Sequence, residues 1–152
     1  MKQYLVAFFL SVLPLVAYAQ EPVWGGLYIE EAYIRATPHG APVGAAFMRI
    51  INRGDNADRL IAAEAKFSKI TQVHSMTVVD NIMRMQEVDG GLEIKSGEEV
   101  TLKPGGYHIM FMGLEEQMLE GEIRTVILHF KDAGAMSLEL PVKALKMQMQ
   151  QK

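Results

Sequence analysis

The sequence contains no cysteine. Without thiols the chain cannot form disulfides, cannot be lipidated on a cysteine, and cannot supply the thiolates of structural zinc sites. A blue-copper electron carrier is also disfavoured, because its metal needs a cysteine thiolate as a strong ligand. The absence therefore argues against a lipoprotein, a zinc domain and a copper protein built for electron transfer.

Clustered positive charge is also lacking. Lysine and arginine together number 15 against 18 acidic residues, which gives a formal net charge of −3. Nucleic-acid binding relies on concentrated basic charge, so we expect no nucleic-acid partner. The chain shows no nucleotide-binding loop, no Ser/His/Asp order and no open carboxylate–histidine site. We therefore expect a protein that is not an enzyme.

Long apolar runs are missing except at the N-terminus. Met1-Lys2 is followed by the apolar run Tyr4–Val16 and then by Ala17-Tyr18-Ala19, a pattern typical of a cleaved signal peptide. The run is shorter than the roughly 20 apolar residues of a membrane span, although an uncleaved anchor is the alternative. We expect a signal peptide at 1–19, an exported domain at 20–143 without a membrane span, a flexible tail at 144–152 and a monomer.

Sustained 3.6-residue periodicity is absent, which predicts little helix. Short segments rich in β-branched and aromatic residues instead alternate with turn signals, a pattern typical of an all-β sandwich or barrel. Asp89-Gly90-Gly91 predicts a hairpin, because adjacent glycines accept positive φ. The predicted strands are Leu27–Arg35, Gly44–Ile51, Arg59–Ala65, Ile70–Val78, Met83–Val88, Glu98–Leu102, Tyr107–Met112, Thr125–Phe130 and Ala135–Val142.

Histidine and methionine occur in two groups that could share a metal ion. His108 and Met110 point the same way from a strand, because side chains alternate across it. A return of the chain after Asp80-Asn81 would bring Met85 back beside His74. Thioether sulfur and imidazole suit Cu(I) much better than zinc or magnesium. The four residues therefore form a candidate Cu(I) site.

Other methionines and histidines have simpler interpretations. Methionine often fills cores, and we assign Met48 and Met136 to that role. His129 is interpreted as structural and His39 as exposed in a loop. The remaining methionines stay open: Met76, Met83 and Met112 between core and rim of the site, with Met83 a competitor of Met85, and Met147 and Met149 between a frayed end and a second copper site.

The chain resembles the PCuAC family of periplasmic copper chaperones. The matching stretches cover nearly all of 27–142: Ile34–Pro38, Gly40–Met48, Asp58–Leu60, Val73–Met76, Met83–Met85, Gly91–Ile94 and Leu102–Leu114. The resemblance implies a cupredoxin-like β-sandwich of Greek-key type in the periplasm that binds Cu(I). It also implies delivery of copper to the assembly of cytochrome c oxidase, at the dinuclear copper site, with an oxidase subunit or assembly factor as partner.

The family motif has a His, ten residues, a Met, about twenty-one residues and then His-x-Met, and it assigns the metal to His74, Met85, His108 and Met110. Here 22 residues separate Met85 from His108, and the additional residue is placed in the Asp89–Gly91 turn. Two other functions stay open. One is a copper buffer that confers resistance, and the other is a metal-free interaction module with a methionine-rich docking surface.

Overall fold

The computed structural model describes residues 24–144, and within this range the chain forms ten strands and no helix. No helix of the described part could therefore span a membrane. The predicted signal peptide lies outside the described residues, as does the predicted tail except for Ala144. The strands are β1 (Leu27–Arg35), β2 (Val43–Asn52), β3 (Asp58–Glu64), β4 (Ser68–Val79), β5 (Ile82–Glu87), β6 (Leu92–Ile94), β7 (Glu99–Leu102), β8 (His108–Leu114), β9 (Ile123–Phe130) and β10 (Gly134–Lys143).

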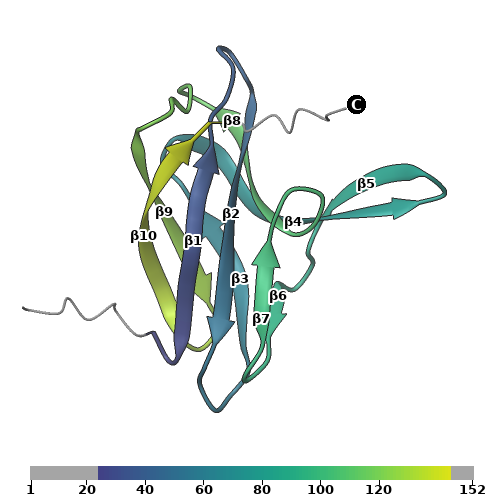
Figure 1. Ribbon diagram of the computed structural model, residues 1–152, viewed down its shortest axis with the longest axis vertical. Helices are drawn as coiled ribbons and strands as arrows, with labels where there is room; N and C mark the ends of the chain where they lie inside the picture. The colour runs from purple at the N-terminus through teal and green to yellow at the C-terminus, as the bar shows by residue number, and fades with distance from the viewer. Residues whose placement is uncertain (1–23, 145–152) are drawn as a thin grey trace, which may run out of the picture.

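The strands form two layers (Figure 1). One layer has the order β5-β4-β8-β2-β1, with β7 also paired to β2, and the other has the order β10-β9-β3-β6. The layers are continuous only where β1 meets β10 in parallel, at Ile34↔Val142 and Arg35↔Lys143. Most other neighbours are antiparallel, as expected for strands that alternate between a buried and a solvated face. The all-β sandwich predicted from the sequence is confirmed.

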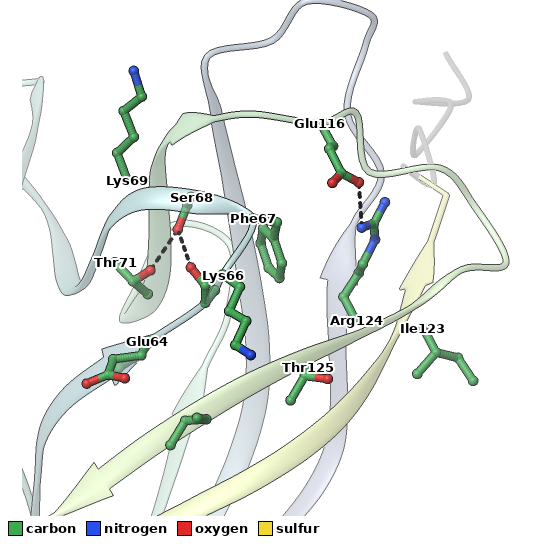
Figure 2. Close-up of a pocket in the computed structure, with 13 residues that line it drawn as sticks. Glu64, Lys66, Phe67, Ser68, Lys69, Thr71, Glu116, Ile123, Arg124 and Thr125 are labelled. Carbon is green, nitrogen blue, oxygen red and sulfur yellow. Dashed lines mark hydrogen bonds and ion pairs between the residues drawn. The ribbon is translucent and has the colours of Figure 1, made fainter.

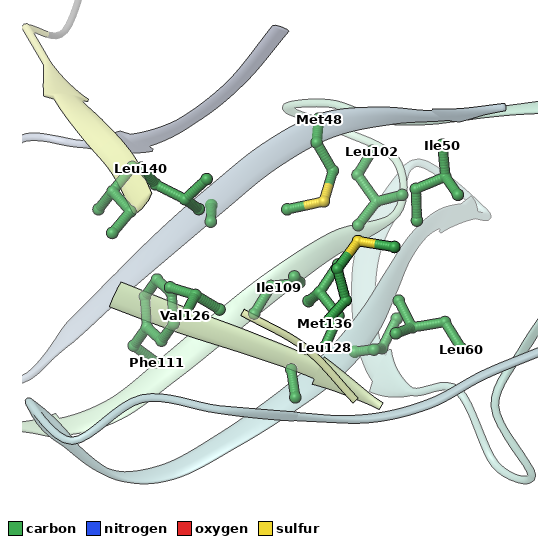
Figure 3. Packing of buried hydrophobic residues seen from close by; sticks show 14 of the residues in the cluster. Met48, Ile50, Leu60, Leu102, Ile109, Phe111, Val126, Leu128, Met136 and Leu140 are labelled. Atoms are coloured by element: carbon green, nitrogen blue, oxygen red, sulfur yellow. The ribbon is translucent and has the colours of Figure 1, made fainter. Parts of the chain in front are cut away.

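The core lies between the two layers and consists of aliphatic, methionine and aromatic side chains (Figure 3). Phe111 of β8 packs edge-on against Phe67, with ring centroids 4.9 Å apart. Met48 and Met136 are both buried in this core, which confirms their assignment as core residues. A core of this size is what allows a domain without disulfides to remain folded.

The turn at Asp89-Gly90-Gly91 was wrongly predicted to be a hairpin. Both glycines do adopt positive φ, 72° and 84°. However, β5 pairs only with β4, whereas β6 pairs with β3 in the other layer. The turn thus carries the chain from one layer to the other, and the short strand β6 beyond it was missed because three residues are too few to show an alternating pattern.

The β4–β5 hairpin extends away from the body of the sandwich (Figure 1). Its turn residues Asp80 and Asn81 both have positive φ, 52° and 59°, as a tight two-residue hairpin turn requires. Every residue of β5 is exposed, the one buried residue of β4 is Val73 near its middle, and the last three residues of β4 are exposed. The predicted return of the chain after Asp80-Asn81 is confirmed, and this arm (77–87) carries Met85.

Candidate metal site

Strands β4 and β8 place the two candidate histidines side by side. The antiparallel register sets His74 directly opposite His108, and the centroids of their rings are 5.9 Å apart. Directly opposed residues in an antiparallel pair project from the same face of the sheet. The neighbours Val73 and Ile109 also oppose each other, but they lie in the core. Both imidazoles therefore project from the face of the layer that is turned away from the core, where His74 is partly buried and His108 is buried, with 5% exposure.

All four candidate ligands share this outer face. Met110 lies two residues after His108 on β8 and opposes Gln72, which lies two residues before His74 on β4. Met85 of β5 opposes Met76, two residues after His74. Side chains two apart on a strand share a face, and opposed residues share it too. None of the four faces away from the others across the sheet.

The two thioethers are not equally placed. Met110 and Met85 are both diagonal neighbours of His74, at a separation that long side chains can bridge. Met110 lies on β8 opposite Gln72, and Met85 lies on β5 opposite Met76, so the two lie on either side of His74. Met85 is therefore one strand further from His108 than Met110 is. Met76 lies between Met85 and the histidines, and it is half-buried, whereas Met85 is 45% exposed. The structure therefore brings Met76 onto the same face as a further sulfur donor.

Hydrogen bonds orient both imidazoles. His74 Nε2 lies 3.0 Å from the side-chain oxygen Oε1 of Gln72, and the amide nitrogen of Gln72 donates to Glu87 at 2.8 Å. His108 Nδ1 lies 3.0 Å from the backbone carbonyl oxygen of Gly106. Each ring thus uses one nitrogen for a protein partner. The other nitrogen of His74, Nδ1, is buried and has no hydrogen-bond partner.

Electrostatics at this face favour the neutral imidazole at His74. Burial lowers the pKa of His74, and the positive charge that His108 can carry lowers it further, while the carboxylate of Glu87 opposes both effects. A metal ligand must be unprotonated, so a lowered pKa keeps His74 available for coordination over a wider range of pH.

The donor set fits a soft monovalent ion. An unpartnered buried nitrogen costs free energy unless a proton donor or a metal satisfies it, and His74 Nδ1 is such an atom. Met110 and Met85 are diagonal neighbours of His74 in its two strand pairs. The part of the chain that the structure describes holds no group of three or more His, Cys, Asp or Glu side chains suited to a metal. Besides the carboxylate of Glu87, which accepts a hydrogen bond from Gln72, this face offers imidazole nitrogens and thioether sulfurs.

The remaining candidates of the sequence are placed elsewhere. His129 lies on β9 with Nε2 3.0 Å from Glu64, and His39 is exposed in the loop after β1. Met112 lies on the outer face opposite Ile70, one step beyond Met110. Met147 and Met149 lie outside the described residues. Sequence reasoning missed Gln72 and Glu87, and only the register of β4 against β5 and β8 could have revealed them.

A groove on the surface lies away from this site. It encloses about 700 Å³ between the β3–β4 connection and the start of β9. Two pairs of its polar residues bind each other: Ser68 with Thr71, and Glu116 with Arg124 at 2.7 Å. Figure 2 shows both pairs. None of the four candidate ligands lines it. The groove therefore contributes nothing to the metal site.

The sequence matches a described protein family and a described relative. The model of the family described as "Putative lipoprotein LpqE-like" matches residues 27–142. A relative described as "Putative lipoprotein Lxx21020", from Leifsonia xyli subsp. xyli, is 30% identical over 118 residues, which cover 78% of this chain and 70% of the relative.

Solved structures share the same fold. The structure titled "Copper-bound PCuAC domain from PmoF2" has a TM-score of 0.66 at 23% identity, covering 80% of this chain and 95% of that domain. The structure of CuI-DR1885 from Deinococcus radiodurans has a TM-score of 0.59 at 23% identity, covering 84% and 83%. The resemblance to PCuAC domains is thereby confirmed for the fold, and the chain belongs to the LpqE-like family.

Proposed function

We propose that this protein is a copper chaperone that carries Cu(I) on His74, Met85, His108 and Met110. The observation that carries the proposal is the opposed pair His74 and His108 on an outer sheet face. Nδ1 of His74 is buried without a hydrogen-bond partner, and the methionines Met85 and Met110 are diagonal neighbours of His74 on the two adjacent strands. Two proteins of similar structure, the PCuAC domain of PmoF2 and DR1885, are described in copper-bound form, which supports the choice of metal.

The chemistry of the donors suits transport of the ion. Imidazoles are the more basic ligands, and neutral thioethers favour the monovalent state. Such a set holds copper without the strong grip of thiolates, so the ion can pass to an acceptor. Four protein ligands leave no open position for a substrate, which is why we propose a carrier rather than a metalloenzyme.

The proposed setting is the periplasm, which the protein would reach through the signal peptide expected at 1–19. We propose that the monomer delivers copper during assembly of cytochrome c oxidase, at the dinuclear copper site. A copper buffer would bind the metal in the same way. Deletion strains distinguish the two: loss of oxidase activity in low copper indicates delivery, whereas sensitivity to added copper with intact oxidase indicates buffering.

The direct test is a Cu(I) titration against a competing chelator. The double variant Met85→Ile and Met110→Ile removes both thioethers while it keeps apolar side chains of similar volume. We expect it to lose at least tenfold in affinity, as removal of metal ligands does. Met83→Ile tests the competing assignment: Met83 lies on the same face but opposes Val78, one step further from His74, so we expect little loss, and a large loss would assign the thioether to Met83. Unchanged affinity of the double variant would refute the assignment.

A second candidate function rests on the apolar surface of the arm. Val78, Val79, Ile82 and Met83 are exposed by 45–66% on a hairpin that packs against no other element at its tip. Exposed apolar clusters mark interaction surfaces, so the domain could act as a metal-free docking module. Metal analysis of the exported protein separates the two candidates, since a docking module would carry no copper.

A further inference from the structure

Next to His74 a short chain of hydrogen bonds ends on a carboxylate. Glu87 opposes His74 across β4 and β5, and Gln72 lies two residues before His74 on the same face. The amide nitrogen of Gln72 is 2.8 Å from Glu87 Oε2, and its oxygen is 3.0 Å from His74 Nε2. The donors and acceptors along these two hydrogen bonds determine which ring nitrogen of His74 carries the hydrogen.

An ionised carboxylate can only accept hydrogen bonds. The group of Gln72 that faces Glu87 must therefore be the NH2, which leaves the amide oxygen of Gln72 facing His74. An amide oxygen also only accepts, so His74 Nε2 must carry the hydrogen. In the neutral ring the lone pair then lies on Nδ1. That atom is the buried nitrogen without a partner.

His108 is fixed in the opposite tautomer. Its Nδ1 is 3.0 Å from the carbonyl oxygen of Gly106, which can only accept, so Nδ1 carries the hydrogen and Nε2 the lone pair. The same carbonyl also accepts from the backbone N–H of Met76 at 3.2 Å, which ties the loop before β8 to β4. In the two opposed rings the lone pair therefore lies on different nitrogens, Nδ1 of His74 and Nε2 of His108.

From this geometry we propose that Gln72 and Glu87 are positioning residues that hold His74 with Nδ1 free for copper, while Gly106 holds His108 with Nε2 free. The inference rests on the proposed function for the identity of the ion, but the tautomers are properties of the metal-free protein. A site set in this way binds the ion without moving a ring proton. Partners of this kind fix ring orientation in metal sites and typically change affinity about 10- to 100-fold.

The tautomers can be read directly by long-range ¹⁵N–¹H NMR of the imidazole rings. The measurement uses the metal-free full chain at about pH 8, above the ordinary histidine pKa near 6.5. We expect Nε2–H at His74 and Nδ1–H at His108. In Gln72→Leu and Glu87→Leu, His74 should become a mixture of tautomers while His108 keeps its own. Glu87→Gln should restore the wild-type pattern, because its amide oxygen can still accept from Gln72.

Gln86→Leu is the matched control, because Gln86 is exposed on the same strand but opposes Ser75 on the other face of the arm. It should change neither ring. A Cu(I) titration of the same variants should show about a tenfold loss for Gln72→Leu and Glu87→Leu and none for Glu87→Gln or Gln86→Leu. If Gln72→Leu does not fold, the comparison of Glu87→Leu with Glu87→Gln carries the test alone.

Failure of this inference differs from failure of the proposed function. Wild-type Nδ1–H at His74, or an unaltered Nε2–H in both leucine variants, would overturn the positioning role while wild-type copper binding stood. Wild-type protein that binds no Cu(I) would overturn the copper function, and with it the purpose assigned to Gln72 and Glu87, even if the tautomers were as expected.

Discussion

His74 and His108 face each other across the β4–β8 pair with ring centroids 5.9 Å apart. At this separation the two rings are unfavourable neighbours when both are protonated, and burial disfavours the charge further. Both effects lower the pKa of His74. The neutral form of His74, which can bind a metal, is therefore favoured.

This arrangement predicts how copper binding responds to acid. A lowered pKa means that the neutral ring of His74 persists below pH 6.5, the ordinary value. Less than half of His74 is therefore protonated at pH 6.5 in the metal-free protein, and proton competition for this ligand increases below that pH. We expect Cu(I) affinity to fall mainly on acidification below about pH 6.5, as His74 gains its proton. Titrations at a series of pH values with a competing chelator measure this, and the variant His39→Gln, at an exposed loop position, serves as control.

The same shift bears on the stability of the metal-free fold. As the pH falls, the unfolded chain takes up the proton of His74 at about pH 6.5, before the folded chain does. The contribution of neutral His74 to the free energy of unfolding is therefore complete above that pH and is lost below it.

A constant copper affinity from pH 7 to about 5 would contradict the assignment of the histidines as ligands.

The position of Met76 leads to a prediction about which sulfur atoms bind. Met76 is a nearer neighbour of His108 than Met85 is, because it follows His74 on the central strand and β5 lies one strand further away. If Met85 is the ligand, Met85→Ile should lower Cu(I) affinity by at least tenfold, and Met76→Ile should have a smaller effect. X-ray absorption of each loaded variant counts the sulfur ligands. Loss of a sulfur in Met76→Ile but not in Met85→Ile would assign the position to Met76.

The sequence predicted the features of the strands and the site residues that depend on local backbone geometry. Alternating apolar residues predicted most strands and the shared orientation of His108 and Met110, because a two-residue period depends only on local backbone geometry. The Asp80-Asn81 hairpin was also predictable, since its turn follows from the residues themselves.

Pairing between distant strands could not be predicted in this way. The connection from β5 to β6 crosses between layers instead of forming a hairpin, because Leu92 and Ile94 are buried beside β3. Turn residues specify a bend but not the partner of the strand that follows it. For the same reason the hydrogen bonds of Gln72 to Glu87 and His74 depend on register, which no local pattern encodes.

The hydrogen bonds of Asp58 lead to a prediction about the stability of the fold that does not involve the metal. Its buried carboxylate accepts the backbone N–H groups of Asp132 at 3.0 Å and Ala133 at 2.9 Å, and so ties the start of β3 to the β9–β10 turn. Asp58→Ala should lower the free energy of unfolding by about 3 kcal/mol, since two hydrogen bonds to a charged group, each worth about 1.5–3 kcal/mol, are lost. Chemical denaturation measures this against the exposed Asp55→Ala, and Cu(I) affinity should not change in either variant.

A side chain at Gly91 is predicted to lower the stability of the fold for a different reason, because the backbone conformation and the surroundings of Gly91 both exclude a Cβ atom. It adopts a φ of 84°, and a Cβ at this position would lie 2.5 Å from the carbonyl oxygen of Leu60. Gly91→Ala should therefore destabilise the fold by at least about 2 kcal/mol, since left-handed backbone costs roughly 1 kcal/mol outside glycine and the clash involves backbone that cannot rotate away. Gly97→Ala is the control, because Gly97 has a similar φ of 75° with open space around it. Denaturation of the two variants isolates the steric part of the cost, and equal losses would show that the close approach of the turn to β3 contributes nothing.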